Sequence, residues 1–173
     1  MAIRNLTDWN DPLFRKISKP VTNFDDRLWT LLDDMRETLE KVKGYGCAAV
    51  HVRVLRRVVV VLDKDGVIEL INPSISETSE KMDRVLEGSI APDAPRGYVE
   101  RPDKVTISAF DRHGEPITIT GEGFLAATFL HEIDHLDGIL FTDKTHPGEA
   151  GERSEGRPAS FAKQNERATE ILR

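Results

Sequence analysis

The chain has 173 residues, with a formal net charge of −6 and a sequence pI near 5.4. Hydrophobic residues make up 39% and charged residues 31%, which is typical of a folded globular domain and excludes a disordered chain. The acidic balance argues against DNA as a partner, because nucleic-acid binding needs a basic face, and no apolar run approaches the length of a membrane span.

The first predicted element is a helix over residues 24–42. Its apolar side chains recur at helical spacing, namely Leu28, Leu31, Leu32, Met35 and Leu39. Asp25 and Asp26 suit the positive N-terminal end of such a helix. A glycine-rich turn is expected next, over residues 44–49.

Strands are predicted to fill the middle of the chain. Residues 56–73, RRVVVVLDKDGVIELINP, indicate two strands joined by a turn at Asp65 and Gly66. A second pair is expected over residues 104–120, hinged near Gly114.

A mostly apolar helix is then predicted from about Gly123 to His135 or a little beyond, with Gly138 as a C-cap. A helix this apolar should be buried against the sheet. The fold class is therefore α+β.

Composition changes at Thr145, where a segment rich in glycine, proline and charge begins. We expect one domain over residues 1–144 and a polar tail over 145–173, with a short helix over 161–173. The single cysteine, Cys47, excludes an internal disulfide, and the first ten residues lack the apolar stretch of a secretory signal. Both features favour the cytoplasm.

His131 and His135 form the strongest chemical signal in the sequence. Their i, i+4 spacing puts both imidazoles on one face of a helix, where they can bind one divalent ion. Glu132 stands where zinc hydrolases keep a general base. The alternative, a surface helix that carries two histidines by chance, fits poorly with the apolar residues 124–130 before them. We expect Asp134 and Asp137 to form hydrogen bonds around the metal ligands without binding the metal themselves, or to lie at a solvated end of the helix.

A hydrolytic metal needs a third protein ligand, and spacing alone does not identify it. The candidates are Asp, Glu, Cys and the other histidines, His51, His113 and His146. His113 falls in a predicted hairpin turn and His146 in the tail, so we expect both to be solvated.

Three motifs in the sequence resemble those of the peptide deformylases, which remove the formyl group from new bacterial chains. They are GYGCAAVH at 44–51, EGSIA at 87–91 and HEIDH at 131–135. The resemblance runs from about residue 10 to 144 and implies mainly antiparallel sheets packed around a central helix that carries His-Glu-x-x-His.

The resemblance also implies a site. His131 and His135 would hold a divalent metal, Fe²⁺ in the family with Zn²⁺ or Ni²⁺ as plausible substitutes, and Glu132 would handle the protons. The backbone N–H of Ile90 would stabilise the oxyanion. The substrate-binding positions would be Gly44, Tyr45, Gly46 and Gly88.

The departures from the family pattern fall in this site. The cysteine that binds the metal is replaced by Ser89, and the active-site glutamine by His51. Cys47 replaces a leucine, Val50 stands where proline is usual, and Leu130 stands where glutamine is often found. Cys47 is expected to be a buried core thiol.

Ser89 predicts weaker metal binding, because a serine hydroxyl normally stays neutral whereas a cysteine thiol has a pKa of about 8.5 that a metal lowers further. His51 has two interpretations. It supplies a third nitrogen ligand, or it only bonds a water or fills the pocket, and the second is favoured because the family's glutamine does not ligate the metal.

Three functions fit these sequence features to different degrees. The first is a deformylase-type metallohydrolase of weakened activity, acting on an N-formylmethionyl peptide or a small N-acyl compound. The second is a catalytically impaired homologue that binds a peptide or regulates. A zincin-type protease is disfavoured because the residues around the motif resemble a deformylase.

A monomer or dimer is expected. Some family members dock to the ribosome through a C-terminal extension; analogy alone suggests that partner, since residues 145–173 do not resemble the extension.

Overall fold

The computed structural model describes residues 2–145. The helix expected over 161–173, the rest of the polar tail and His146 lie outside the described residues. None of the helices in the described part of the chain is long and apolar enough to cross a membrane.

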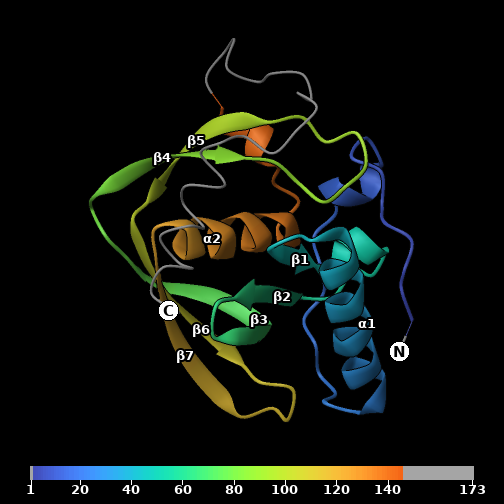
Figure 1. Ribbon diagram of the computed structural model, residues 1–173. Helices are drawn as coiled ribbons and strands as arrows, with labels where there is room; N and C mark the ends of the chain where they lie inside the picture. The colour runs from blue at the N-terminus through green and yellow to red at the C-terminus, as the bar shows by residue number, and fades with distance from the viewer. Residues whose placement is uncertain (1, 146–173) are drawn as a thin grey trace.

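The larger sheet has five strands in the order β1-β2-β3-β6-β7, and every neighbouring pair is antiparallel (Figure 1). Its strands are β1 (Gly46–Ala48), β2 (Val58–Asp63), β3 (Gly66–Thr78), β6 (Lys104–Phe110) and β7 (Pro116–Glu122). The two predicted strand pairs are therefore confirmed. Asp63 pairs with Gly66, so the tight turn is Lys64–Asp65, one residue earlier than predicted, and Gly66 takes a φ of 129°. Strand β3 also runs past Pro73, with a shift in register next to it.

Two elements differ from the sequence expectations. Residues 46–48, expected within a turn, form the buried strand β1, which is followed by the 3-10 helix η2 (Ala49–Val52). A strand of three residues is too short to show a period, and pairing with β2 fixes it. The second sheet, β4 (Met82–Glu87) paired with β5 (Gly97–Pro102), was not predicted. The loop between these strands carries Ser89.

Helix α1 (Asp26–Val42) begins two residues later than predicted. Asp25 is the N-cap, and its side chain accepts hydrogen bonds from the backbone N–H groups of Arg27 and Leu28. The five apolar side chains that predicted the helix are all buried. They pack with strand residues in one of the two apolar clusters of the core.

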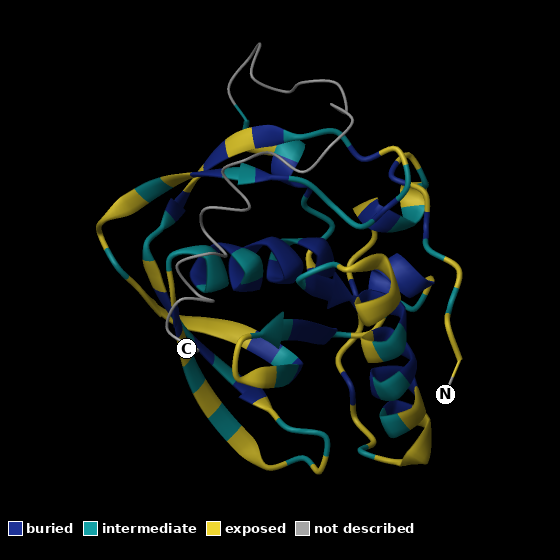
Figure 2. Ribbon diagram, viewed as in Figure 1, coloured by how far each residue is buried: buried dark blue, intermediate teal, exposed yellow. Residues whose placement is uncertain are grey.

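Helix α2 (Phe124–Leu136) confirms the predicted apolar helix. It ends in a Schellman motif, in which Ile139 N–H bonds the Asp134 carbonyl and Gly138 takes a φ of 71°. The helix contacts β1, β2 and β7 on one side and β5 on the other, so it lies between the two sheets (Figure 1). Figure 2 shows α2 buried along most of its length, which puts the histidine pair inside the molecule. The 3-10 helices η1 (Pro12–Arg15) and η3 (Phe141–Asp143) pack near its C-terminal end.

Candidate metal centre

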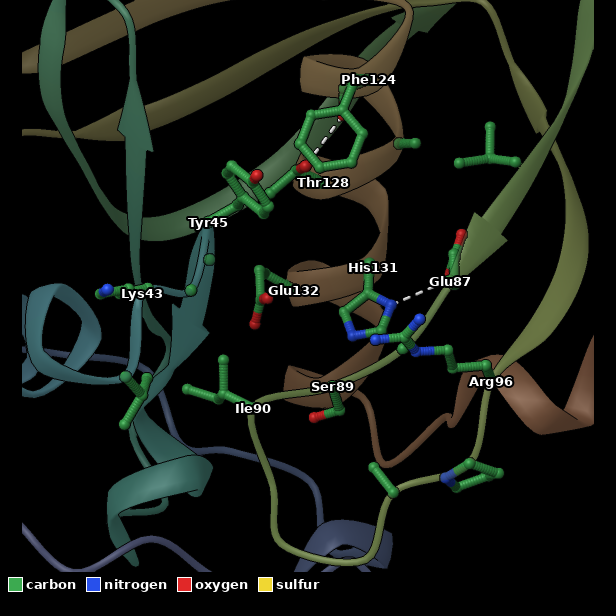
Figure 3. A pocket seen from close by; sticks show the side chains of 18 of the residues that line it. Lys43, Tyr45, Glu87, Ser89, Ile90, Arg96, Phe124, Thr128, His131 and Glu132 are labelled. Atoms are coloured by element: carbon green, nitrogen blue, oxygen red, sulfur yellow. Dashed lines mark hydrogen bonds and ion pairs between the residues drawn. The ribbon is translucent and has the colours of Figure 1, made fainter. Parts of the chain in front are cut away.

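A cavity of about 500 Å³ lies beside α2 and reaches the histidine pair (Figure 3). Its walls come from the turn before β1, from β4 and the loop after it, and from α2. The residues assigned to substrate binding from the resemblance all line it, namely Gly44, Tyr45, Gly46 and Gly88. Ser89, Ile90, His131 and Glu132 line it as well, so segments far apart in the sequence meet here.

His131 and His135 converge through their Nε2 atoms, which are 3.1 Å apart, and both side chains are buried. With Zn–N bonds of about 2.0–2.1 Å, two tetrahedral ligands of one ion are separated by roughly 3.3 Å. The pair therefore has the spacing of two nitrogens that bind one metal. Nδ1 of His135 is buried without a hydrogen-bond partner among the described residues.

Glu87 fixes the ring of His131. The imidazole Nδ1–H donates to Oε2 of Glu87 at 2.7 Å, which leaves Nε2 facing the cavity (Figure 3). Arg101 donates two hydrogen bonds to the same carboxylate, at 2.7 and 3.0 Å, and a third to Asp134 at 2.6 Å. Burial opposes ionisation of Glu87, but these donors outweigh it and lower its pKa to about 2. In the sequence, Glu87 stands out only as the first residue of the EGSIA motif. Glu87 and His131 are 44 residues apart, and at that separation a single sequence carries no signal that two residues pair.

The titration of the two imidazoles differs for a physical reason. Burial alone would lower the pKa of His131, but the bond to Glu87 and the charge of Glu132 outweigh it, so the pKa is raised. Burial lowers the pKa of His135 well below its ordinary value, and the neighbouring His51, His131 and Arg101 lower it further. His135 is therefore neutral, which is the form that binds metals.

Glu132 is the buried acid of the cavity. It is 4% exposed, and its Oε2 has no hydrogen-bond partner among the described residues. Desolvation raises its pKa to about 7. Gly46 lies so close that a Cβ there would be 2.5 Å from Oε1 of Glu132. A carboxyl with one free oxygen and a pKa near neutrality suits a group that takes and returns a proton.

His51 lies in η2 and is 1% exposed. Its Nε2 is 3.0 Å from Oγ of Ser89, and its Nδ1 is 3.2 Å from both the backbone N and O of Ala48. Burial lowers the pKa of His51 to about 3, so the ring is neutral. Its Nδ1 lies 3.8 Å from Oε2 of Glu132, which is a polar contact and not an ion pair, because the ring carries no charge.

Ser89 lies at the mouth of the histidine cluster. Its Oγ accepts the backbone N–H of Ala91 at 3.2 Å and has His51 as its other neighbour. Figure 3 shows the hydroxyl on the loop after β4, beside Ile90 and facing the cavity. Ser89, which stands where the family resemblance predicts a thiolate ligand, therefore has a half-buried hydroxyl next to a histidine.

Aromatic side chains enclose the histidine rings on the side away from the cavity. Phe14 lies 5.2 Å from the rings of both His51 and His135, and Phe141 stacks on His131 at 5.7 Å. Trp9 meets the edge of His135. These contacts could not be predicted, because the three aromatic residues are far from the motifs in the sequence. They exclude water and hold the rings in place.

The remaining candidates lie outside the cluster. Cys47 is fully buried and packs in the apolar cluster with α1, as expected of a core thiol. His113 is exposed in the β6–β7 turn, where it contacts Trp29. Asp134 bonds Arg101, and Asp137 bonds Arg57 at the helix end. The expectations for these residues hold.

Comparison with known proteins identifies the family. The polypeptide deformylase family model matches residues 3–150, so the chain belongs to that family. The peptide deformylase of Acetivibrio thermocellus is 49% identical over 145 residues, covering 83% of this chain and 84% of the relative. The crystal structure of a peptide deformylase from Legionella pneumophila superposes with a TM-score of 0.80 at 41% identity, over 84% of this chain and 88% of that one. A Met-Ala-Ser-bound peptide deformylase from Acinetobacter baumannii gives 0.77 at 28% identity, over 83% and 98% of the two chains.

The residues present fit the divalent metal on which this family depends. His131 and His135 supply two converging nitrogens, and one donor atom each of His51, Glu132 and His135 lies within 4.8 Å of the others. The neutral ring of His135 and the carboxylate acceptor that orients His131 both suit metal binding.

Proposed function

We propose that this chain is a deformylase-type hydrolase that removes the formyl group from N-formylmethionyl peptides or a related N-acyl compound. The observation that carries the proposal is Glu132, a buried carboxyl whose Oε2 has no hydrogen-bond partner in the described chain, beside converging histidine nitrogens in a deformylase fold. A relative has been crystallised with Met-Ala-Ser, the product that deformylation of formyl-Met-Ala-Ser would leave.

His131 and His135 would hold the metal. When bound, a divalent ion supplies Lewis acidity, which lowers the pKa of a water and polarises a carbonyl. Glu132 accepts a proton from the attacking water and delivers it to the leaving amine. The backbone N–H of Ile90 donates to the developing oxyanion, and Gly44, Tyr45, Gly46 and Gly88 border the peptide.

The cavity supports a peptide substrate. Its volume of about 500 Å³ lies within the range of ligand sites, roughly 300–1,000 Å³. Apolar walls next to Tyr45 and Phe124, whose rings meet edge to face at 4.9 Å, suit an apolar first side chain such as methionine.

A second candidate is a binding or regulatory protein that keeps the cavity without efficient turnover. Ser89 favours it, because a neutral hydroxyl replaces an anionic thiolate and removes a strong ligand. The two candidates differ in formate release and agree on peptide binding.

The test is formate release from formyl-Met-Ala-Ser by the purified chain loaded with Zn²⁺, Ni²⁺, Co²⁺ or Fe²⁺. We expect turnover that falls about 10²–10⁴-fold in Glu132→Gln, which keeps the shape of the side chain and loses the base. No formate from any metal-loaded sample, with Met-Ala-Ser still bound in calorimetry, would establish the second candidate.

A further inference from the structure

We infer that His51 supplies the third protein ligand of the metal in place of the missing thiolate, giving a centre of three imidazoles. The inference rests on the proposed function only in requiring a bound divalent metal. The family's glutamine at this position does not bind the metal, so the assignment gives His51 a new role.

The histidine pair lacks a strong third ligand. Hydrolytic metal sites use three protein ligands and a water, and His131 with His135 supplies two. Ser89 supplies a weak third donor at best, because its hydroxyl is neutral. Its Oγ is also engaged by Ala91 N–H and by His51.

The imidazole of His51 lies where a third ligand is needed. Its Nε2 lies 3.0 Å from Oγ of Ser89, so it reaches the corner of the site at which the family keeps its sulfur. Its ring centre is 4.6 Å from that of His135, and the two rings are nearly perpendicular. A donor atom of His51 lies within 4.8 Å of donor atoms of both His135 and Glu132.

The backbone of Ala48 contacts the other nitrogen of the His51 ring. A metal-binding histidine usually donates its other N–H to a carboxylate or a backbone carbonyl. Nδ1 of His51 lies 3.2 Å from the carbonyl oxygen of Ala48, just as Nδ1 of His131 bonds Glu87. The backbone N–H of Ala48 is equally close to Nδ1, at 3.2 Å, so ligation through Nε2 requires the tautomer in which Nδ1–H donates to the Ala48 carbonyl.

The turn that carries His51 is also fixed. Thr7 N–H donates to the His51 carbonyl at 2.8 Å, and the Thr7 hydroxyl donates to the Val50 carbonyl at 2.7 Å. Phe14 packs edge-on against the imidazole. The ring is therefore preorganised for ligation, and its position does not depend on a flexible loop.

The consequence is a change in metal preference. A set of three imidazoles without a thiolate suits zinc, copper and nickel, which bind neutral nitrogens in the order of the Irving–Williams series. The glutamine that assists the oxyanion in the family has no equivalent when His51 binds the metal. Ile90 N–H then remains as the proposed donor, which predicts slower turnover.

The experiment measures Zn²⁺ affinity by competition with a chromophoric chelator, on the full chain and three variants. Wild type and Ser89→Ala should bind one Zn²⁺ with similar affinity. His51→Gln should lose more than about 100-fold, beyond the 10–100-fold range of outer partners. The double variant His51→Gln/Ser89→Cys should regain affinity, and its Co²⁺ form should show a sulfur-to-cobalt charge-transfer band that wild type lacks.

Three results would overturn the inference. They are a loss in Ser89→Ala without one in His51→Gln, a loss in His51→Gln within the range of an outer partner, and zinc binding by the double variant but not by wild type. Zinc bound through His51 without formate release would refute the proposed function and leave the ligand assignment intact. Formate release with wild-type zinc affinity in His51→Gln would do the reverse.

Discussion

Gly46→Ala is expected to displace the carboxyl of Glu132, the proposed proton carrier, with little change elsewhere. The new methyl would lie 2.5 Å from Oε1 of Glu132, 2.8 Å from its Cγ and 2.9 Å from its Cδ, so the whole carboxyl end must move. The backbone at Gly46 is outside the left-handed region and accepts alanine. The effect therefore comes from the contact with Glu132.

The magnitude follows from the size of the overlap. Overpacking a buried site costs about 1–3 kcal/mol, which lowers the melting temperature by roughly 2–4 °C per kcal/mol in a chain of this size. A misplacement of about 1 Å in a reacting group costs on the order of 10²-fold in rate. We expect kcat/KM for formyl-Met-Ala-Ser to fall at least that far, measured by formate release well below the melting temperature.

Gly121→Ala is the matched control. Its methyl would lie 2.9 Å from Phe129 and 3.1 Å from the backbone N of Ala126, so it overpacks the same helix away from the carboxyl. Both variants should lose similar stability, and only Gly46→Ala should lose most of its turnover. Equal turnover in the two variants would refute the reasoning that Gly46 exists to make room for Glu132.

Three further predictions follow from the buried network and the core. Glu87→Gln should weaken Zn²⁺ binding about 10–100-fold, measured by chelator competition, because His131 loses its carboxylate acceptor; unchanged affinity would contradict this. Glu87 has a pKa of about 2 against an ordinary 4.5, so the metal-free chain should lose stability as pH falls from about 4.5 to 2, and urea unfolding should show a shallower loss in Glu87→Gln. Leu32→Ala, at a fully buried position on α1, should destabilise by about 2–5 kcal/mol in urea while turnover below the transition stays at the wild-type level.

The long elements of the fold could be predicted because their periods are complete. Five apolar positions along α1 and the apolar run of α2 each cover several turns, and the hairpin β2–β3 combines an apolar run of valines with a turn that contains glycine. Strand β1 has three residues and gains its conformation from its neighbour β2. Strands β4 and β5 carry charged side chains such as Arg84 and Glu100 on their outer faces, which masked their apolar residues.

The residues of the site also differ in how far the sequence alone could identify them. The pair His131 and His135 follows from helical spacing, which is a local property. Ser89 became a candidate through the family resemblance, which also distinguished His51 from the other histidines, and the structure brings their Oγ and Nε2 atoms to 3.0 Å. Glu87 and Phe14 act on the imidazoles through contacts between distant segments, and a single sequence holds no signal for such pairs.

Formate release from formyl-Met-Ala-Ser, titrated against the amount of bound Zn²⁺, tests the central claim most directly. The account predicts a rate that rises in proportion to bound metal up to one equivalent, is absent from the metal-free chain and falls about 10²–10⁴-fold in Glu132→Gln. A fully loaded wild-type chain that releases no formate, or a rate that does not depend on bound metal, would contradict it.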